Sequence, residues 1–503
     1  MSLHAQLSPE AQVRLEVQQR NSTISSLAIT VLSILLLGLT LGYILLDGVF
    51  KETRPDIFVS SGPKDPDPPL DAPKVPLSLE RKPSAPSAAR NPMIVSPLSA
   101  TVSIPTVDLP VSEPTAYFGD GDGDFGRGGI IGTGPGDFVP GLPQDLNKRC
   151  MKQDRLARLQ STGGTVACEE AVEKALQWLK SSQSKEGNWP GNVSNTGFAL
   201  LVYLGRCETP LSEEYGESCL RAIIYLVDLG MKNKGGWLTT SPNPATNKQI
   251  AYEHAINTYA LAEATTFCKL LQKEGMVAIP NLEEVTQRAG QLIIDNQTSQ
   301  GGWEYHYAET STRGGGDLSI TAWQIQALKA CKHTGIDFRN LTPCVRRAMD
   351  YIEGLAGSNG GFGYSSPGKG HTDYNTLTGA GMLCLQIWDK GSRSAVRNGA
   401  RYVDANTKFD YNTRYADLYG HYYEAQAMLN RGGEQWNRYN KLFRDQLLDN
   451  QNPDGSWKVP GGGGKDLRAV APAYLQDATY RTCLCTLMLE VYYRFLPSTD
   501  TPH

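Results

Sequence analysis

The feature that most constrains the fold is a short motif, Gln-x-x-x-Gly-x-Trp, that recurs in the second half of the chain. Around each copy the order of parts is the same: an amphipathic helix, the glycine-aromatic turn, a loop of variable length, and a second, more apolar helix. Such a unit cannot bury its apolar face alone, so the units must pack on one another. The complete copies are Gln183, Gly187 and Trp189; Gln297, Gly301 and Trp303; and Gln451, Gly455 and Trp457, and partial copies end at Trp237 and Phe362.

Hydrophobic spacing predicts six helical pairs within residues 150–497. In the first pair, Val172, Ala175, Leu176 and Leu179 stand at the spacing of a one-sided helix, whereas the partner helix at 195–205 is apolar almost all round. Six hairpins can close into a ring, and an open solenoid would need capping repeats with polar faces. The other pairs are 219–230 with 252–268, 285–296 with 317–332, 345–355 with 373–388, 396–405 with 415–429, and 436–448 with 477–496.

Residues 21–46 carry no charged side chain and are more than long enough to span a bilayer, which takes roughly 20 apolar residues. A cleaved signal peptide is the alternative. It would have a basic start, a shorter apolar core and a cleavage site of small residues, whereas residues 1–20 form a tail of mixed charge. We therefore predict a single-pass membrane anchor at 21–46. Gly38 and Gly42 form a GxxxG pattern that could pair two copies as a homodimer.

Residues 47–149 are rich first in proline and then in glycine, and they lack apolar periodicity. We expect a disordered linker between the anchor and the ring. Asp120, Asp122 and Asp124 resemble the start of a calcium loop, but Phe125 and Ile131 stand where that loop requires glycine and glutamate. The formal net charge of −4 gives no indication of a nucleic-acid partner.

The positions of the cysteines indicate in which cellular compartment the ring lies. Cys207 and Cys219 flank one connection between repeats, and Cys331 and Cys344 flank another. This equivalent placement suggests two disulfides, and hence a ring that lies outside the cytoplasm in an oxidising compartment. The alternative is that the cysteines are small buried residues at helix ends. The basic residues on the two sides of the span are nearly balanced, so they do not decide the orientation.

The repeated motif followed by an inner helix resembles the QW repeats of squalene-hopene cyclases and the related repeats of protein prenyltransferase β subunits. The resemblance covers residues 170–497 and implies an all-α fold, the (α/α)6 toroid of terpenoid-cyclase-like proteins. It also implies that the motif is structural, with the glutamine tying helix ends together and the tryptophan packing on the neighbouring repeat. Fold alone does not establish function.

The catalytic residues of these families are incomplete here. Class II cyclases carry Asp-x-Asp-Asp-Thr-Ala at the start of an inner helix, and the matching run begins at Asp317 but lacks both later carboxylates. Asp317 is therefore better explained as an N-cap than as a general acid. In the prenyltransferase zinc set, Asn375 stands in place of a cysteine and Arg481 in place of a histidine. We predict no metal site and no cofactor.

Polar residues gather near the expected N-terminal ends of the inner helices, which should meet at one mouth of the ring. Unpaired N–H groups and helix dipoles there favour anionic or polar ligands. Arg481 would add a permanent positive charge and His254 a pH-dependent one. The alternative is capping and aromatic packing. The candidate ligand-binding residues are Tyr252, Glu253, His254, Asp317, Asp373, Tyr374, Asn375, His421, Tyr422, Tyr480 and Arg481, of which Asp317 and His254 are also candidates for catalysis.

The sequence thus predicts a membrane-anchored (α/α)6 ring whose central cavity binds a hydrophobic or isoprenoid-like ligand. The missing acid and metal ligands favour binding over catalysis. Two other functions stay open. One is a divergent terpenoid cyclase or prenyl-transferring enzyme, and the other is a non-catalytic scaffold for a peptide or protein.

Overall fold

The computed structural model describes residues 150–233, 235–272, 276–307, 316–367, 376–463 and 472–494. These residues form helices and connecting loops, and their only β-pairings are two isolated bridges. Six helical pairs follow a leading helix, α3 (Lys152–Ser161), which confirms the predicted all-α architecture. The pairs are α4 (Val166–Ser182) with α5 (Ser194–Gly205), α6 (Gly216–Lys232) with α7 (Ile250–Gln272), α8 (Leu282–Asp295) with α9 (Leu318–His333), α10 (Leu341–Gly354) with α11 (Thr378–Leu385), α12 (Ser394–Asn406) with α13 (Leu418–Arg431), and α14 (Gly433–Leu448) with α15 (Ala478–Leu489).

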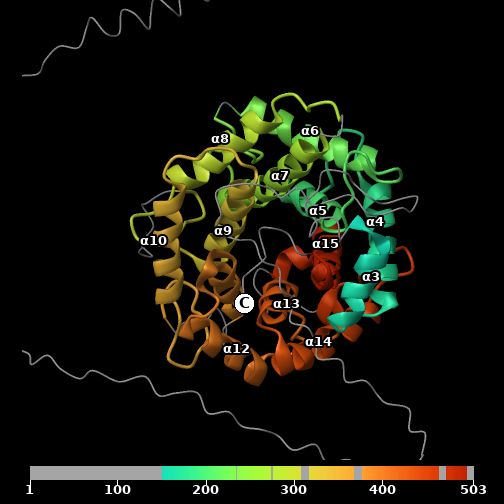
Figure 1. Cartoon of the computed structure of the whole chain (residues 1–503), viewed down its shortest axis with the longest axis vertical. Helices are drawn as coiled ribbons and strands as arrows, with labels where there is room; N and C mark the ends of the chain where they lie inside the picture. Colours follow the sequence, from blue (N-terminus) through green and yellow to red (C-terminus); the bar gives the residue numbers. More distant parts are fainter. Residues whose placement is uncertain are drawn as a thin grey trace, which may run out of the picture. The chain divides into compact units, whose positions relative to one another are not determined.

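Four short helices complete the described elements: η1 (Gln386–Lys390), η2 (Pro460–Gly463), η3 (Pro472–Gln476) and η4 (Glu490–Tyr492). The inner helices pack in chain order from α5 through α7, α9, α11 and α13 to α15, and α15 returns to contact α5. The outer helices surround them, and α14 contacts α4 (Figure 1). The six pairs therefore form a closed toroid.

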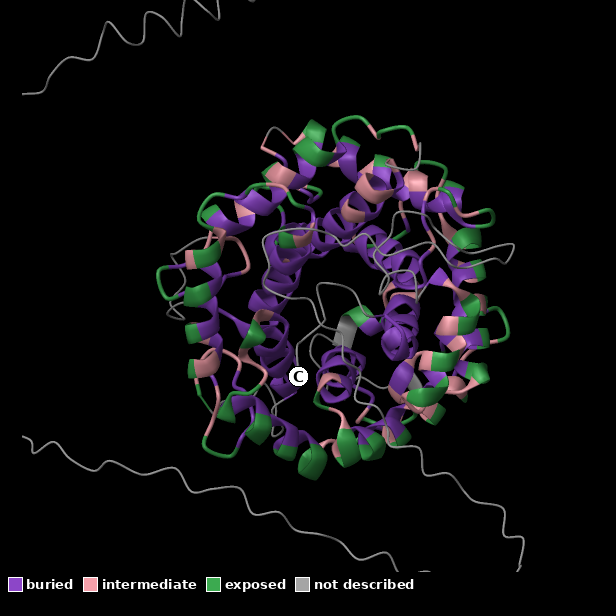
Figure 2. Cartoon of the chain, viewed as in Figure 1, coloured by how far each residue is buried: buried purple, intermediate pink, exposed green. Residues whose placement is uncertain are grey.

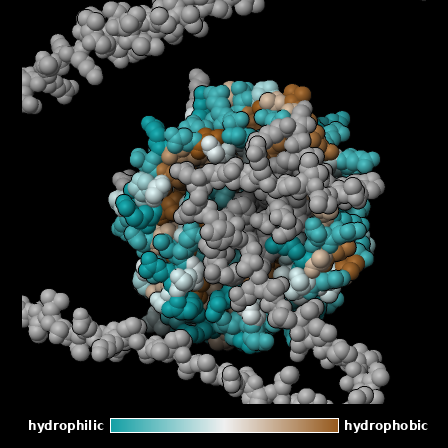
Figure 3. All heavy atoms as spheres, in the orientation of Figure 1, coloured by the Kyte–Doolittle hydropathy of each residue, from teal (hydrophilic) through white to brown (hydrophobic). Residues whose placement is uncertain are grey.

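The two layers differ in burial as the sequence pattern requires. Every residue of α5 is buried, because the helix is covered by its neighbours in the inner ring and by the outer layer. The outer helix α8 buries one side, through residues such as Leu282, Val285 and Ala289, and exposes the other. Figure 2 shows the same contrast around the whole ring, and the rim of the face seen in Figure 3 is mostly hydrophilic.

The three complete copies of the motif make the same contacts. Each tryptophan is buried and donates its indole N–H to a carbonyl ten residues earlier, in its own outer helix. Each glutamine donates from Nε2 to the carbonyl of its motif glycine and to a carbonyl of a neighbouring outer helix. The acceptors are Gly187 and Ser218 for Gln183 (2.9 and 3.0 Å), Gly301 and Cys344 for Gln297 (2.8 and 2.8 Å), and Gly455 and Ala171 for Gln451 (3.0 and 2.7 Å).

The motif glycines are required by both conformation and space. Gly187, Gly301 and Gly455 have φ values of +98°, +100° and +96°, a region that side chains with a Cβ rarely adopt. An added Cβ would also lie 2.4 Å from the carbonyl oxygen of Arg221, 2.4 Å from that of Arg347 and 2.1 Å from that of Lys174, respectively. Glycine therefore allows each turn to pack directly on the backbone of the next outer helix.

Both predicted disulfides are wrong. Cys207 bonds to Cys150 at the start of the described chain, with 5.0 Å between the Cα atoms. Cys219 is a buried free thiol that donates to the carbonyl of Glu208, 3.4 Å away. Cys331 and Cys344 are also free and buried, and burial raises the pKa of each to about 12. The second interpretation, small buried residues at helix ends, therefore describes these three cysteines.

The predicted anchor at 21–46, its GxxxG pair and the linker at 47–149 lie outside the described residues. Among the helices of the described ranges, none has the length and apolar character needed to cross a membrane.

Candidate functional site

The N-terminal ends of five inner helices converge on a cleft with about 560 Å³ of empty space, part of it open to solvent. We call it the aromatic cleft, because six of its twelve lining residues carry aromatic rings. It is lined by Asn192, Ser194, Asn195 and Phe198 at the start of α5, Gln249, Tyr252 and Ile256 at the start of α7, Trp323 of α9, Tyr419 of α13, and Tyr474, Asp477 and Tyr480 around the start of α15.

The aromatic rings of the cleft pack on one another and on the core. Phe198 meets Trp323 edge to face at 5.3 Å and Tyr480 at 5.4 Å between ring centroids. Trp323 stacks at 5.3 Å on Tyr422, which does not line the cleft. Such contacts fix ring orientation and stabilise the wall. The cleft is therefore a preformed apolar surface.

A chain of hydroxyl groups connects the cleft to a buried acid. Ser319 Oγ donates to Asp317 Oδ1 at 2.5 Å, and the Ser319 and Tyr252 hydroxyls lie 2.5 Å apart. Because Ser319 has one hydroxyl proton and gives it to Asp317, Tyr252 donates to Ser319. Tyr419 also reaches this point through a 2.9 Å hydrogen bond to the Ser319 carbonyl. Asp317 is thus two hydrogen bonds away from the cleft.

Asp317 is the N-cap of α9, as its sequence position predicts. Oδ1 accepts the backbone N–H of Ser319 at 2.7 Å and that of Ile320 at 3.4 Å. Burial raises the pKa of this carboxyl from its ordinary value, because it disfavours the charged form, and the hydrogen bonds act in the opposite direction. Asp317 therefore combines capping with a raised proton affinity beside the cleft.

Glu253 and His254 follow Tyr252 on α7 but point away from the cleft. Glu253 accepts from Asn192 Nδ2 at 2.8 Å and from Asn247 Nδ2 at 2.9 Å, and so fastens the loop before α7. His254 Nδ1 accepts the Leu238 N–H at 3.0 Å, so Nε2 carries the proton that it shares with the Ala289 carbonyl. Burial lowers the pKa of His254 to about 4. His254 was predicted as a ligand-binding or catalytic group, whereas in the structure both ring nitrogens bind backbone and the ring does not line the cleft.

Arg481 also turns away from the cleft. Its Nε donates to the Trp457 carbonyl at 2.8 Å and its Nη1 to the Leu475 carbonyl at 2.7 Å. These bonds join the third motif to η3 and the start of α15. Arg481 was predicted to supply positive charge to a ligand, whereas in the structure its guanidinium satisfies buried carbonyls and does not line the cleft.

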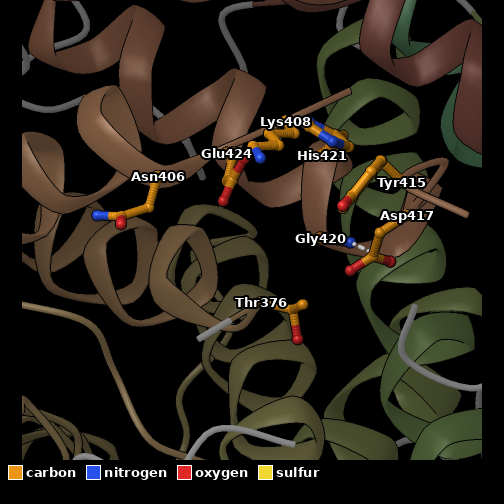
Figure 4. A pocket seen from close by; sticks show the side chains of 8 residues that line it. All are labelled: Thr376, Asn406, Lys408, Tyr415, Asp417, Gly420, His421 and Glu424. Atoms are coloured by element: carbon orange, nitrogen blue, oxygen red, sulfur yellow. Dashed lines mark hydrogen bonds and ion pairs between the residues drawn. The ribbon is translucent and has the colours of Figure 1, made fainter. Parts of the chain in front are cut away.

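A second pocket, with about 300 Å³ of empty space, lies at α12 and α13 (Figure 4). His421 lines it, with Nδ1 at 2.8 Å from the Tyr439 hydroxyl and 3.5 Å from Glu424 Oε2, and burial lowers the pKa of His421 to about 3. Asp417 caps α13 through the Gly420 N–H. These contacts are structural. The lining residues are Thr376, Asn406, Lys408, Tyr415, Asp417, Gly420, His421 and Glu424.

The structure thus brings together two of the predicted site residues, Tyr252 and Tyr480, with Asp317 behind Tyr252. Asp373, Tyr374 and Asn375 lie outside the described residues. Sequence reasoning missed Phe198 and Trp323, although both share a simple signal: each is a bulky aromatic residue in the first two turns of an inner helix. The described ranges contain no group of three or more His, Cys, Asp or Glu side chains that could hold a metal ion.

No protein-family model matches the chain, and no curated protein is significantly similar to it. Some solved structures are similar to the chain at low identity. The unsaturated glucuronyl hydrolase of Bacillus sp. GL1 is 11% identical with a TM-score of 0.43, over 67% of this chain and 97% of that chain. The type II terpene cyclase MstE of Scytonema, in complex with geranylgeranyl dihydroxybenzoate, is 12% identical with a TM-score of 0.41, over 66% of this chain and 98% of that chain. Similarity this low says nothing about activity, so function must be argued from the site.

Proposed function

We propose that this protein binds a hydrophobic or isoprenoid-like ligand in the aromatic cleft, and that a membrane anchor at 21–46 holds the ring near the lipid from which the ligand comes. The observation that carries the proposal is the preformed apolar wall of Phe198, Ile256 and Trp323 at the mouth of a closed ring. Each methylene group that leaves water for such a wall contributes about 0.8 kcal/mol. A ligand of several carbons can therefore bind without a charged anchor.

The residues of the cleft support ligand binding more directly than they support the catalytic reactions of cyclases or prenyltransferases. Asp317 lacks the two neighbouring carboxylates of the cyclase motif, and Arg481 stands where the zinc histidine would be. Its guanidinium is occupied by backbone carbonyls. The groups that line the cleft are phenols, amides, the Ser194 hydroxyl, one carboxylate and apolar side chains, which can hold and orient a ligand.

The proposal is tested by filling the cleft. Gln249 lines the cleft and is half-buried, and Gln249→Trp places an indole in the empty space. The neighbouring Lys248→Trp is the matched control, because Lys248 is exposed and does not line the cleft. Wild-type full-length protein and the Lys248 variant should release the same co-purifying apolar molecule on extraction and mass spectrometry, and the Gln249 variant should release less. Equal amounts from both variants would contradict the assignment of the cleft.

A second function, an acid–base enzyme acting on the same ligand, is favoured by one observation. The chain from Asp317 through Ser319 to Tyr252 can carry a proton between a buried acid and the cleft. Ser319→Ala breaks this chain and keeps the backbone cap of Asp317. If the protein is an enzyme, this variant should still bind farnesol while losing the conversion of farnesol that the wild type performs, followed by gas chromatography and mass spectrometry. If the wild type binds farnesol but does not convert it, the binding function stands and the enzyme function is contradicted. If the wild type binds no farnesol, the scaffold alternative remains.

A further inference from the structure

The charged side chains in the wall of the aromatic cleft and directly behind it are carboxylates on α7, α9 and α15, whereas α5 carries no charged side chain. Asp477 lies in the lining itself. Glu253 stands directly behind Asn192, whose Nδ2 it accepts at 2.8 Å, and Asp317 stands behind Tyr252 through Ser319. Among the described lining residues there is no lysine, arginine or histidine. Both oxygens of Asp477 accept hydrogen bonds from uncharged donors, Oδ2 from Asn195 Nδ2 at 2.8 Å and Oδ1 from the backbone N–H groups of Thr479 and Tyr480. The described wall therefore carries a negative charge with no compensating cation.

Helix dipoles do not reverse this sign. The inner helices direct the positive ends of their dipoles at the mouth, and each end is equivalent to about half a positive charge. Three of these ends carry an aspartate as N-cap: Asp317 on α9, Asp417 on α13 and Asp477 on α15. An ionised cap carries a whole negative charge and occupies the free N–H groups that would otherwise bind an anion. The mouth is therefore a poor site for an anion, contrary to the sequence-based expectation.

The basic side chains near the cleft make their contacts elsewhere. Lys248, which precedes the lining residue Gln249, donates to the Pro244 carbonyl at 2.8 Å. Arg481 gives its Nε and Nη1 protons to the carbonyls of Trp457 and Leu475. The Arg494 guanidinium lies 5.8 Å from the ring centre of Tyr259, which is two helical turns along α7 from Tyr252. Neither guanidinium belongs to the lining of the cleft.

The phenols of the cleft respond to the same negative surroundings. Burial is the main cause that raises the pKa of Tyr480, and the charges of Asp417 and Asp477 raise it further. The pKa of Tyr252 is raised by burial and also by Asp317. The carboxylates that disfavour ionisation of these phenols would favour a positively charged neighbour, and so would the electron-rich faces of the rings.

We propose that the ligand of the aromatic cleft carries an organic cation, a quaternary or substituted ammonium group, at the end of an apolar body. This inference rests on the proposed function, since it names the chemical class of the polar end of that ligand. The apolar body packs on Phe198, Ile256 and Trp323. The ammonium group lies among Tyr252, Tyr480 and Asp477, where aromatic rings attract it by cation–π contact and the carboxylate by charge.

The test compares three soluble probes of equal chain length, namely hexyltrimethylammonium, hexan-1-ol and hexanesulfonate. Each is titrated calorimetrically into the full-length protein in lipid nanodiscs, with empty nanodiscs as the blank. The cation should bind at least about tenfold more tightly than the alcohol, and the sulfonate most weakly. Binding of the sulfonate as tight as that of the cation would overturn the inference and leave the proposed function intact. If none of the three probes binds, the proposed function fails as well.

Two variants assign the preference to the named residues. Asp477→Asn removes the charge and keeps the cap, since asparagine caps as well as aspartate, so it should reduce the preference for the cation over the alcohol. Asp454→Asn is the control, because Asp454 makes the same kind of turn bonds in an exposed loop away from the cleft. Tyr480→Leu should weaken binding of the cation more than binding of the alcohol, whereas Tyr480→Phe, which keeps the aromatic ring, should not. An unchanged preference in both Asp477→Asn and Tyr480→Leu would overturn the inference.

Discussion

Gln451 donates its side-chain amide to the backbone carbonyl of Ala171, 280 residues earlier in the chain. The same amide also donates to Gly455, so one side chain shapes the last turn and joins it to the first outer helix. Gln183 and Gln297 make the equivalent bonds between neighbouring repeats. The contact that organises each repeat is therefore also the contact that closes the ring.

Replacing Gln451 with alanine should weaken this closure. Two hydrogen bonds are lost, each worth about 0.5–1.5 kcal/mol, so the free energy of unfolding should fall by about 1–3 kcal/mol. Chemical denaturation followed by circular dichroism measures the change. Gln160→Ala is the control, since Gln160 is exposed on α3 and its replacement should leave stability unchanged. A Gln451 variant as stable as the Gln160 variant would show that the closing bond contributes nothing.

Replacing Gly301 with alanine should destabilise the ring through the backbone. A residue with a Cβ in the left-handed region costs of order 1–3 kcal/mol, and here the Cβ also meets the Arg347 carbonyl at 2.4 Å. Gly354→Ala is the control, because Gly354 lies in helix α10 with nothing within 4 Å of an added Cβ. That variant should be slightly more stable than the wild type, by less than the roughly 0.5–1 kcal/mol of a mid-helix position, because Gly354 is the last residue of α10. Opposite signs in thermal unfolding would support the turn geometry, and equal signs would contradict it.

The fold could be predicted because its determinants are local and repeated. One repeat is enough to recognise the apolar spacing of its helices, the glycine of its turn and its buried tryptophan. Six such repeats can close into a ring. The disulfide could not be predicted, because Cys150 and Cys207 are 57 residues apart and meet only through the packing of the first repeat. The sequence pattern instead paired Cys207 with Cys219, which is a buried free thiol in the structure.

The sequence could predict where the site lies in the fold, but not which side chains line it. Sequence reasoning placed Tyr252 and Tyr480 at a common mouth because helix starts converge in a ring. It could not tell which neighbours turn inward, since adjacent residues on a helix differ in direction by about 100°. Tyr252 faces the cleft, whereas His254 packs against Leu238 and Ala289. Charge at a helix start therefore did not indicate charge in the cleft.

The stability of the ring should depend on pH through Asp317. Its pKa in the folded state lies above the ordinary value of 3.8, so between 3.8 and the raised value the folded state binds more protons than the unfolded state. Stability from this group is therefore lost as pH rises through that interval. Asp317→Asn keeps the cap and does not titrate. The variant should gain stability relative to the wild type as pH rises from about 4, measured by denaturant titration at several pH values. A constant difference would contradict a raised pKa.

His254 should act in the opposite direction. Burial lowers its pKa to about 4 from the ordinary 6.5, so between these values the unfolded state binds more protons and stability falls as pH decreases. The loss approaches about 1.4 kcal/mol per pH unit for one such group. Carbon-13 NMR of labelled histidine should show the His254 ring neutral at pH 5, with its signal assigned by its loss in His254→Gln. A ring that titrates near 6.5 would contradict the buried backbone contacts.

Arg481 provides the sharpest contrast between a ligand role and a structural one. Arg481→Lys keeps the charge but cannot reproduce the fork that reaches both the Trp457 and Leu475 carbonyls. Losing one hydrogen bond from a charged donor should lower the free energy of unfolding by about 1.5–3 kcal/mol. Binding of hexyltrimethylammonium at a temperature where the variant is folded should match the wild type, because Arg481 does not line the cleft. A variant with unchanged stability and altered binding of the probe would show that Arg481 contributes to the ligand site.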